Sequence, residues 1–165
     1  MWHTAAMAVA DKDILYRVAY EEAVRALADQ QAEIDSYRTR AGLLFSSAVI
    51  TTSLLGAGSF DGADLTVSSW LALATFTGAA TISVAILWPR PWELTASSPD
   101  VVKTYIEGEE PAAVDELHRD LSIHMQKSYV ENRSGVLHLA VLLQVASALL
   151  TIEVVLWIIA IATSS

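Results

Sequence analysis

One carboxyl group stands inside the most apolar stretch of this sequence. The stretch LLTIEVVLWIIAIATSS, residues 149–165, has a single ionisable side chain, Glu153, and Trp157 follows it one helical turn later. A charged side chain at the centre of a bilayer costs roughly 2.5–3.5 kcal/mol on insertion scales. No Lys or Arg occurs in any long apolar segment. Glu153 therefore has no cation to pair with there, so its carboxyl group is either protonated or hydrated by water in a cavity.

Three roles are open for this carboxyl group: a neutral, hydrogen-bonded contact between helices, a step in the passage of protons or ions, or a contact between copies of the chain. We expect its hydrogen-bond partner at similar depth to be Ser53, Trp70 or Trp157. An acid that is structural would tolerate replacement by glutamine, whereas an acid that relays protons would not.

A second group of polar side chains lies nearly opposite Glu153 on the same predicted helix, namely Gln144, Ser147 and Thr151. The other two apolar segments are also rich in hydroxyl groups and small residues. Such residues let membrane helices approach and bond to one another. They would line a pore only in an oligomer, because three helices enclose little space. We therefore treat Glu153, Gln144 and Trp157 as the intramembrane functional candidates.

Several classes of chemistry find no support in the residues. The chain has no cysteine, so it offers no thiolate nucleophile and no cysteine metal site. His118 and His124 are six residues apart, whereas two ligands on one helix face would be four apart. No phosphate-binding, hydrolase or metalloprotease motif occurs, so we predict no catalytic residue, no metal, no cofactor and no enzyme activity. A net charge of −9 argues against nucleic acid as a partner.

Three segments are long enough to hold these side chains in a membrane: residues 41–60, 68–88 and about 136–162. A helix needs roughly 20 residues to cross the hydrocarbon. All ten Lys and Arg lie before the first segment or between the second and third. By the positive-inside rule, the N-terminus and the long loop are cytoplasmic and the C-terminus is outside. We predict a multi-pass protein of the bacterial plasma membrane, with the lipid bilayer as a partner.

Long helices are expected to continue from two of these spans into the cytoplasm. Residues 11–58 read as one helix, and a second starts at Pro111 and enters the third span, with a possible kink at Gly135. A short helix is expected at 98–108, and the sequence WPRPW, residues 88–92, should break the chain after the second span. The fold class is an all-α integral membrane protein with three transmembrane helices, two of them extended into a cytoplasmic helical stalk. Its predicted segments are 1–40, 41–88, 89–135 and 136–165.

A seam of apolar and amphipathic residues runs along the first cytoplasmic helix. Its members are spaced 4, 3, 4 and 3 residues apart, as in a coiled coil: Tyr20, Val24, Leu27, Gln31 and Ile34. A seam in water must be covered, either by the other stalk helix or by another copy of the chain. Both are open, and a homo-oligomer is the functional alternative.

Three stretches of the chain carry a resemblance to known proteins. RTRAGLLFSSAVITTSLLG, ILWPRPWELTASSPDVVKTYIEG and YVENRSGVLHLAVLLQVASALLTIEVVLW resemble a group of small uncharacterised membrane proteins of actinobacteria. The shared features are Arg40-Ala41-Gly42, Trp88 to Trp92, Tyr105, Asn132, Glu153 and Trp157. More distantly, the architecture is similar to the SLATT and Pycsar-type transmembrane effectors of antiphage systems. The SLATT plan has two spans, whereas this chain has three. That likeness implies a membrane-perturbing role in antiviral defence and carries over no catalytic residue.

The sequence thus favours a non-enzymatic inner-membrane protein that oligomerises, an effector or scaffold whose cytoplasmic helices sense or recruit a protein or a small-molecule signal. The alternatives are an ion- or proton-conducting protein that uses Glu153, or an accessory subunit of a larger membrane complex.

Overall fold

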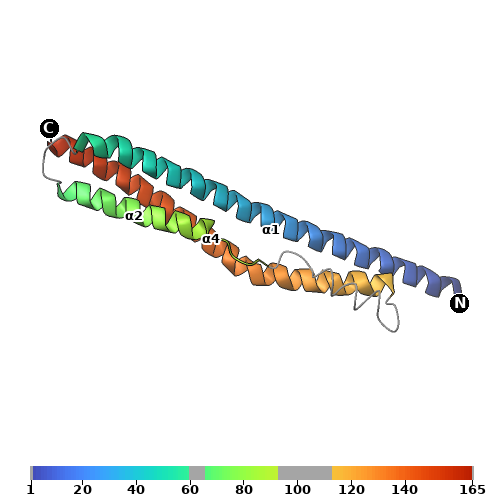
Figure 1. Ribbon diagram of the computed structural model, residues 1–165. Coiled ribbons are helices and arrows are strands. Elements are labelled where there is room, and N and C mark those ends of the chain that lie inside the picture. Colours follow the sequence, from blue (N-terminus) through green and yellow to red (C-terminus); the bar gives the residue numbers. More distant parts are fainter. Residues whose placement is uncertain (1, 60–65, 93–112, 165) are drawn as a thin grey trace. The chain divides into compact units, whose positions relative to one another are not determined.

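The computed structural model describes residues 2–59, 66–92 and 113–164, and in these residues every regular element is a helix. The helices are α1 (Trp2–Ser59), α2 (Val67–Leu87) and α4 (Val114–Ser164), as labelled in Figure 1. Each is long and apolar enough to cross a membrane. The prediction of an all-α chain with three candidate spans is confirmed.

Helix α1 is longer than the sequence analysis predicted. We expected it to begin near residue 11, but it begins at Trp2. The first turns, WHTAAMAVA, contain neither Gly nor Pro and are rich in alanine, the best helix former, so nothing in them stops the helix. No break separates the charged N-terminal part of α1 from its apolar part, as predicted.

Helix α2 has a clear start and a clear stop. The hydroxyl of Thr66 accepts a hydrogen bond from the backbone N–H of Ser69 at 3.3 Å, which caps the first turn. The helix ends at Leu87, immediately before the sequence WPRPW. Pro89 and Pro91 lack the N–H that would extend the helical hydrogen bonds, so the predicted break is confirmed.

Helix α4 begins later than expected, at Val114 and not at Pro111. Asp115 and Glu116 lie in its first turn, where negative charge is favoured by the helix dipole. Pro111 and the predicted short helix at 98–108 lie outside the described residues. The helix is not interrupted at Gly135. A Cβ atom there would lie 2.9 Å from the ring of Trp92, so the glycine provides the space in which that indole packs.

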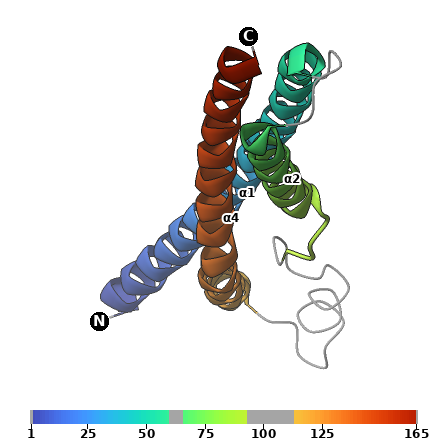
Figure 2. The same ribbon diagram turned by 90° about the vertical axis from the view of Figure 1, so that its left-hand side faces the viewer.

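Contacts divide the chain into two units. Unit 1 consists of residues 1–33 and 91–136, and unit 2 consists of residues 34–90 and 137–165. In each unit a segment of α1 lies beside a segment of α4, and in unit 2 these two segments also lie beside α2 (Figures 1 and 2).

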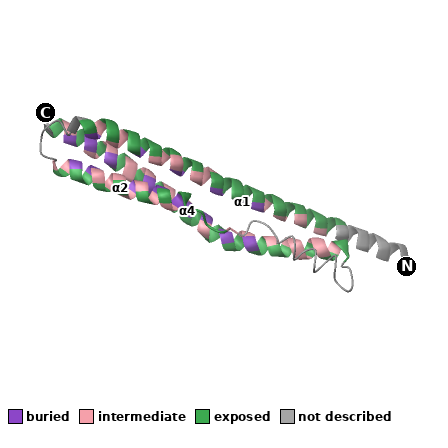
Figure 3. Cartoon of the chain, viewed as in Figure 1, coloured by how far each residue is buried: buried purple, intermediate pink, exposed green. Residues whose placement is uncertain are grey.

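The buried residues of each helix fall on a seam with spacings of three and four, which Figure 3 shows as purple patches separated by exposed surface. On α1 a strict seven-residue repeat of buried residues joins Leu27, Ile34, Ala41 and Ala48. On α2 the buried positions are Ser69, Ala72, Ala79, Ser83 and Ile86. This is the repeat of helices packed with knobs in holes, and alanine and serine at these positions allow close approach.

Candidate functional site

Glu153 belongs to the buried seam of α4. The seam repeats every seven residues through Asn132, Leu139, Ala146, Glu153 and Ala160, and the last four are at most 1% exposed. Glu153 itself is 0% exposed. A helix that places Leu139 and Ala146 against its neighbours in unit 2 must place Glu153 there also. The side chain therefore faces other helices and not the surface that would meet lipid.

The partner of this carboxyl group is Thr52 of α1. The Thr52 hydroxyl donates a hydrogen bond to Oε1 of Glu153 across the two helices. Our expectation of Ser53 or Trp70 is wrong: Ser53 is exposed one position further along α1, and Trp70 is 61% exposed. Thr52 lies four residues after the buried Ala48, so it is Thr52 and not Ser53 that continues the seam of α1.

Thr52 differs from most other hydroxyl residues of the apolar helices. Those side chains donate to the backbone carbonyl four residues earlier, which satisfies them within their own helix: Ser46, Ser47, Thr75, Thr77, Thr81, Ser147, Thr151 and Thr163. The Thr52 hydroxyl instead donates its hydrogen bond to a residue of another helix. Its bond to Glu153 joins α1 to α4 within unit 2.

Trp157 lies beside the acid, as the sequence analysis expected. It is 0% exposed and packs with Ala72 of α2 and Ala160 of its own helix in one buried cluster. Its indole is close enough to interact with the Glu153 carboxyl group, but its N–H has no hydrogen-bond partner of normal geometry among the described residues. Because Ala72 and Ala160 are small, they leave the space that the indole ring of Trp157 fills.

The site retains unused hydrogen-bonding capacity. Within the described residues, Oε2 of Glu153 and Nε1 of Trp157 are both buried and without a partner. No Lys or Arg occurs in the apolar segments of α1, α2 or α4, and the nearest histidine, His138, is about four turns earlier on α4. The arrangement can hold two helices together by a polar contact. The described residues of these apolar segments include no second acid to exchange a proton with Glu153.

Gln144, the third intramembrane candidate, is not part of this site. It is exposed on α4, nine residues before Glu153 and so on the opposite side of the helix, as predicted. The structure therefore brings Glu153 and Trp157 together and leaves Gln144 apart.

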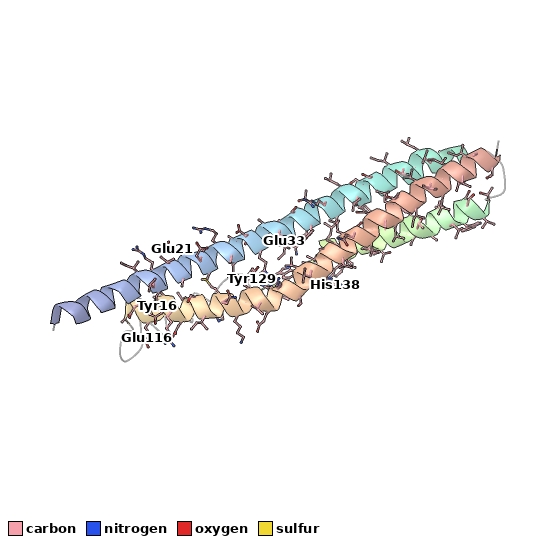
Figure 4. All side chains as sticks on the ribbon, turned by 180° about the vertical axis from the view of Figure 1, so that it is seen from behind. Tyr16, Glu21, Glu33, Glu116, Tyr129 and His138 are labelled. Carbon is pink, nitrogen blue, oxygen red and sulfur yellow. The ribbon has the colours of Figure 1, made fainter. Side chains whose placement is uncertain are left out.

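In unit 1, α1 and α4 pair in parallel with a nearly constant register. The rings of Tyr20 and His118 stack with centroids 5.3 Å apart, and Nε2 of Gln30 donates to the backbone carbonyl of Tyr129 at 3.1 Å. Tyr129 is labelled on α4 in Figure 4. His124, the other histidine considered above, is exposed.

The predicted seam of α1 is split by this pairing. Leu27 and Ile34 are buried at 4% and 2% exposure, and Tyr20 is half-buried. Val24 is 41% exposed and Gln31 is also exposed. The positions that face α4 in their place are Ala23 and Gln30, which have the same heptad spacing from Leu27 and Ile34 but lie on the other flank of the seam, because α1 is rotated toward that side. Val24 and Gln31 remain available to another molecule.

An open groove lies on unit 1 between the two helices, with a volume of about 510 Å³. Its walls are mostly small or apolar side chains of both helices: Ala19, Glu22, Ala23, Ala26, Ser122, Ile123 and Gln126. Leu15, one turn before Ala19 on the same side of α1, is an exposed large apolar side chain. No group of three or more His, Asp or Glu side chains that could hold a metal ion occurs in the described residues.

Three long apolar helices, with a polar contact buried between two of them, define this chain as a candidate multi-pass helical membrane protein. Comparison with known protein families, with curated proteins and with solved structures finds no match.

Proposed function

We propose that this chain is a non-enzymatic membrane protein that associates with itself and acts as an effector or scaffold. Unit 2 is its membrane anchor, and the helix pair of unit 1 is its cytoplasmic interaction surface. All ten Lys and Arg lie before the first span or between the second and third, and by the positive-inside rule this distribution supports a cytoplasmic position for unit 1. The further suggestion of a membrane-perturbing role in antiphage defence rests on the resemblance alone.

The observation that carries the proposal is the apolar surface of unit 1. Two helices cannot bury all the apolar side chains they bear, and the exposed fractions of Leu15, Val18 and Val24 are 62%, 47% and 41%. Of these side chains, Leu15 lies one turn from the alanine-lined groove, and exposed apolar surface of this kind is typical of a site for another helix. Because the helices of unit 1 are parallel and repeat every seven residues, a further helix with the same repeat would pack in the same way.

A charge placed in the groove tests this proposal. Ala19→Glu puts a carboxylate in the groove wall, and Ala32→Glu makes the same substitution at an exposed site on α1 that does not line the groove. We expect native mass spectrometry of the full chain in detergent to show an oligomer for the unmodified protein and for Ala32→Glu. Ala19→Glu should shift the distribution toward monomer. A monomer in all three proteins would refute self-association.

The second candidate function, conduction of protons or ions through Glu153, has one observation in its favour, which is a buried acid with an unpaired oxygen. The full burial of Glu153 and of Trp157, one turn later on the same helix, favours the structural role instead. Glu153→Gln separates the two. Loss of a proton flux into liposomes, with assembly retained, would support conduction.

A further inference from the structure

Gln144 presents a polar group on a surface that should otherwise be apolar. The apolar segment of α4, residues 136–162, has its midpoint at residue 149. Gln144 is five residues from that midpoint, or about 7.5 Å along the helix axis. Since the hydrocarbon extends roughly 15 Å on each side of its centre, the amide lies inside it.

The side-chain amide of Gln144, unlike the hydroxyl groups near it, forms no hydrogen bond with its own helix. Exposed hydroxyl groups nearby, such as that of Thr151, donate to their own helix at 3.0 Å. The amide of Gln144 has no hydrogen-bond partner in the parts of the chain that the structure describes. Leaving an amide without a partner in hydrocarbon costs several kcal/mol, and acyl chains offer neither donor nor acceptor.

The residues around Gln144 form a second heptad face on α4, separate from the buried seam. Its members are spaced four and three apart, and all are exposed: Leu137, Val141, Gln144, Ala148, Thr151, Val155, Ile158 and Ala162. Ala148 and Thr151 are small and lie one and two turns after the glutamine. A helix with this repeat can pack closely against another, and one polar residue within such a seam fixes its register.

We propose that this face of α4 is the membrane contact between two copies of the chain, with Gln144 of each copy paired to Gln144 of the other. The argument for an identical partner is electrostatic complementarity. An amide has a positive N–H side and a negative carbonyl side, so two amides related by a two-fold axis each donate one bond and accept one. A two-fold axis along the membrane normal brings the same residues of two parallel helices together.

This contact deepens the proposed self-association and rests on it, but it belongs to unit 2, whereas the groove belongs to unit 1. The test uses the absence of cysteine from the chain. Ala148→Cys places a thiol on the Gln144 face, and Ala74→Cys places one at an exposed position of α2 as the matched control. In native membranes treated with a copper–phenanthroline oxidant, Ala148→Cys should form a disulfide-linked dimer and Ala74→Cys should not.

Adding Gln144→Leu to Ala148→Cys should reduce the cross-linking, because two hydrogen bonds are lost while side-chain volume is kept. Intramembrane bonds of average strength correspond to about a tenfold weaker association. Equal cross-linking at both positions, or cross-linking unaffected by Gln144→Leu, would overturn the proposed contact. If Ala148→Cys in the otherwise unmodified chain gives no cross-link, while the oligomer persists in Gln144→Leu and is lost in Ala19→Glu, the inference fails and the proposed function stands. A monomeric unmodified chain would refute both.

Discussion

Replacing Thr52 by valine isolates the polar contact between α1 and α4. Valine has the shape of threonine, so the substitution removes the hydroxyl without leaving a cavity. The carboxyl group of Glu153 then loses the donor to Oε1, and because Oε2 is already unpaired, both oxygens become unsatisfied in a site that is 0% exposed. Hydrogen bonds between membrane helices contribute about 0.6 kcal/mol on average and up to about 1.7. A buried polar group left without a partner adds to the loss, so we expect about 1–2 kcal/mol.

Thr77→Val is the matched control, since the Thr77 hydroxyl is exposed and donates to the Leu73 carbonyl of its own helix at 2.8 Å. Its expected effect is under about 0.5 kcal/mol. Thermal unfolding in detergent, followed by circular dichroism, should place Thr52→Val roughly 2–8 °C below the unmodified protein and the control within about 2 °C of it. In a double-mutant cycle with Glu153→Leu, the two losses should not add, because each removes the same bond. Equal melting of the two valine variants, or strict additivity in the cycle, would show that the contact does not hold the helices together.

Two further predictions concern topology and packing. The N-terminus should be cytoplasmic and the C-terminus outside, so a membrane-impermeant maleimide applied to intact cells should label Ser164→Cys and spare Ala5→Cys; the reverse pattern would contradict the orientation. Gly42→Ala should be neutral or stabilising, because nothing lies within 4 Å of the added Cβ atom, whereas the same change at Gly135 meets the Trp92 ring at 2.9 Å. We expect Gly135→Ala to melt below Gly42→Ala, by up to about 1 kcal/mol in stability because the outer edge of the Trp92 ring can shift, and equal melting temperatures would show that Trp92 does not pack there.

The class of fold could be predicted from the sequence because its signals are local. Apolar segments long enough to cross a bilayer, and the absence of Pro and Gly between residues 11 and 41, are properties of consecutive residues. So is the stop at WPRPW, where two prolines lack the N–H that a helix needs. The start of α4 was placed three residues too early. Proline at the first helical position is common but not required. Here the helix starts at Val114, which is followed by the acidic residues Asp115 and Glu116 in the first turn.

The pairing of side chains could not be predicted in this way. The sequence shows that Glu153 needs a partner, but whether the partner is Thr52 or Ser53 depends on which side of α1 faces α4, and adjacent residues differ by about 100° around the helix. For the same reason Val24 and Gln31 were assigned to a seam that in the structure contains Ala23 and Gln30. The seven-residue repeat of Leu27, Ile34, Ala41 and Ala48 was visible in the sequence and, continued by four residues, would have pointed to Thr52. Local residue patterns thus suffice to predict the helices and the polar groups that need partners. Which of these groups meet depends on the rotation of each helix about its axis, and that rotation is set by packing against the other helices.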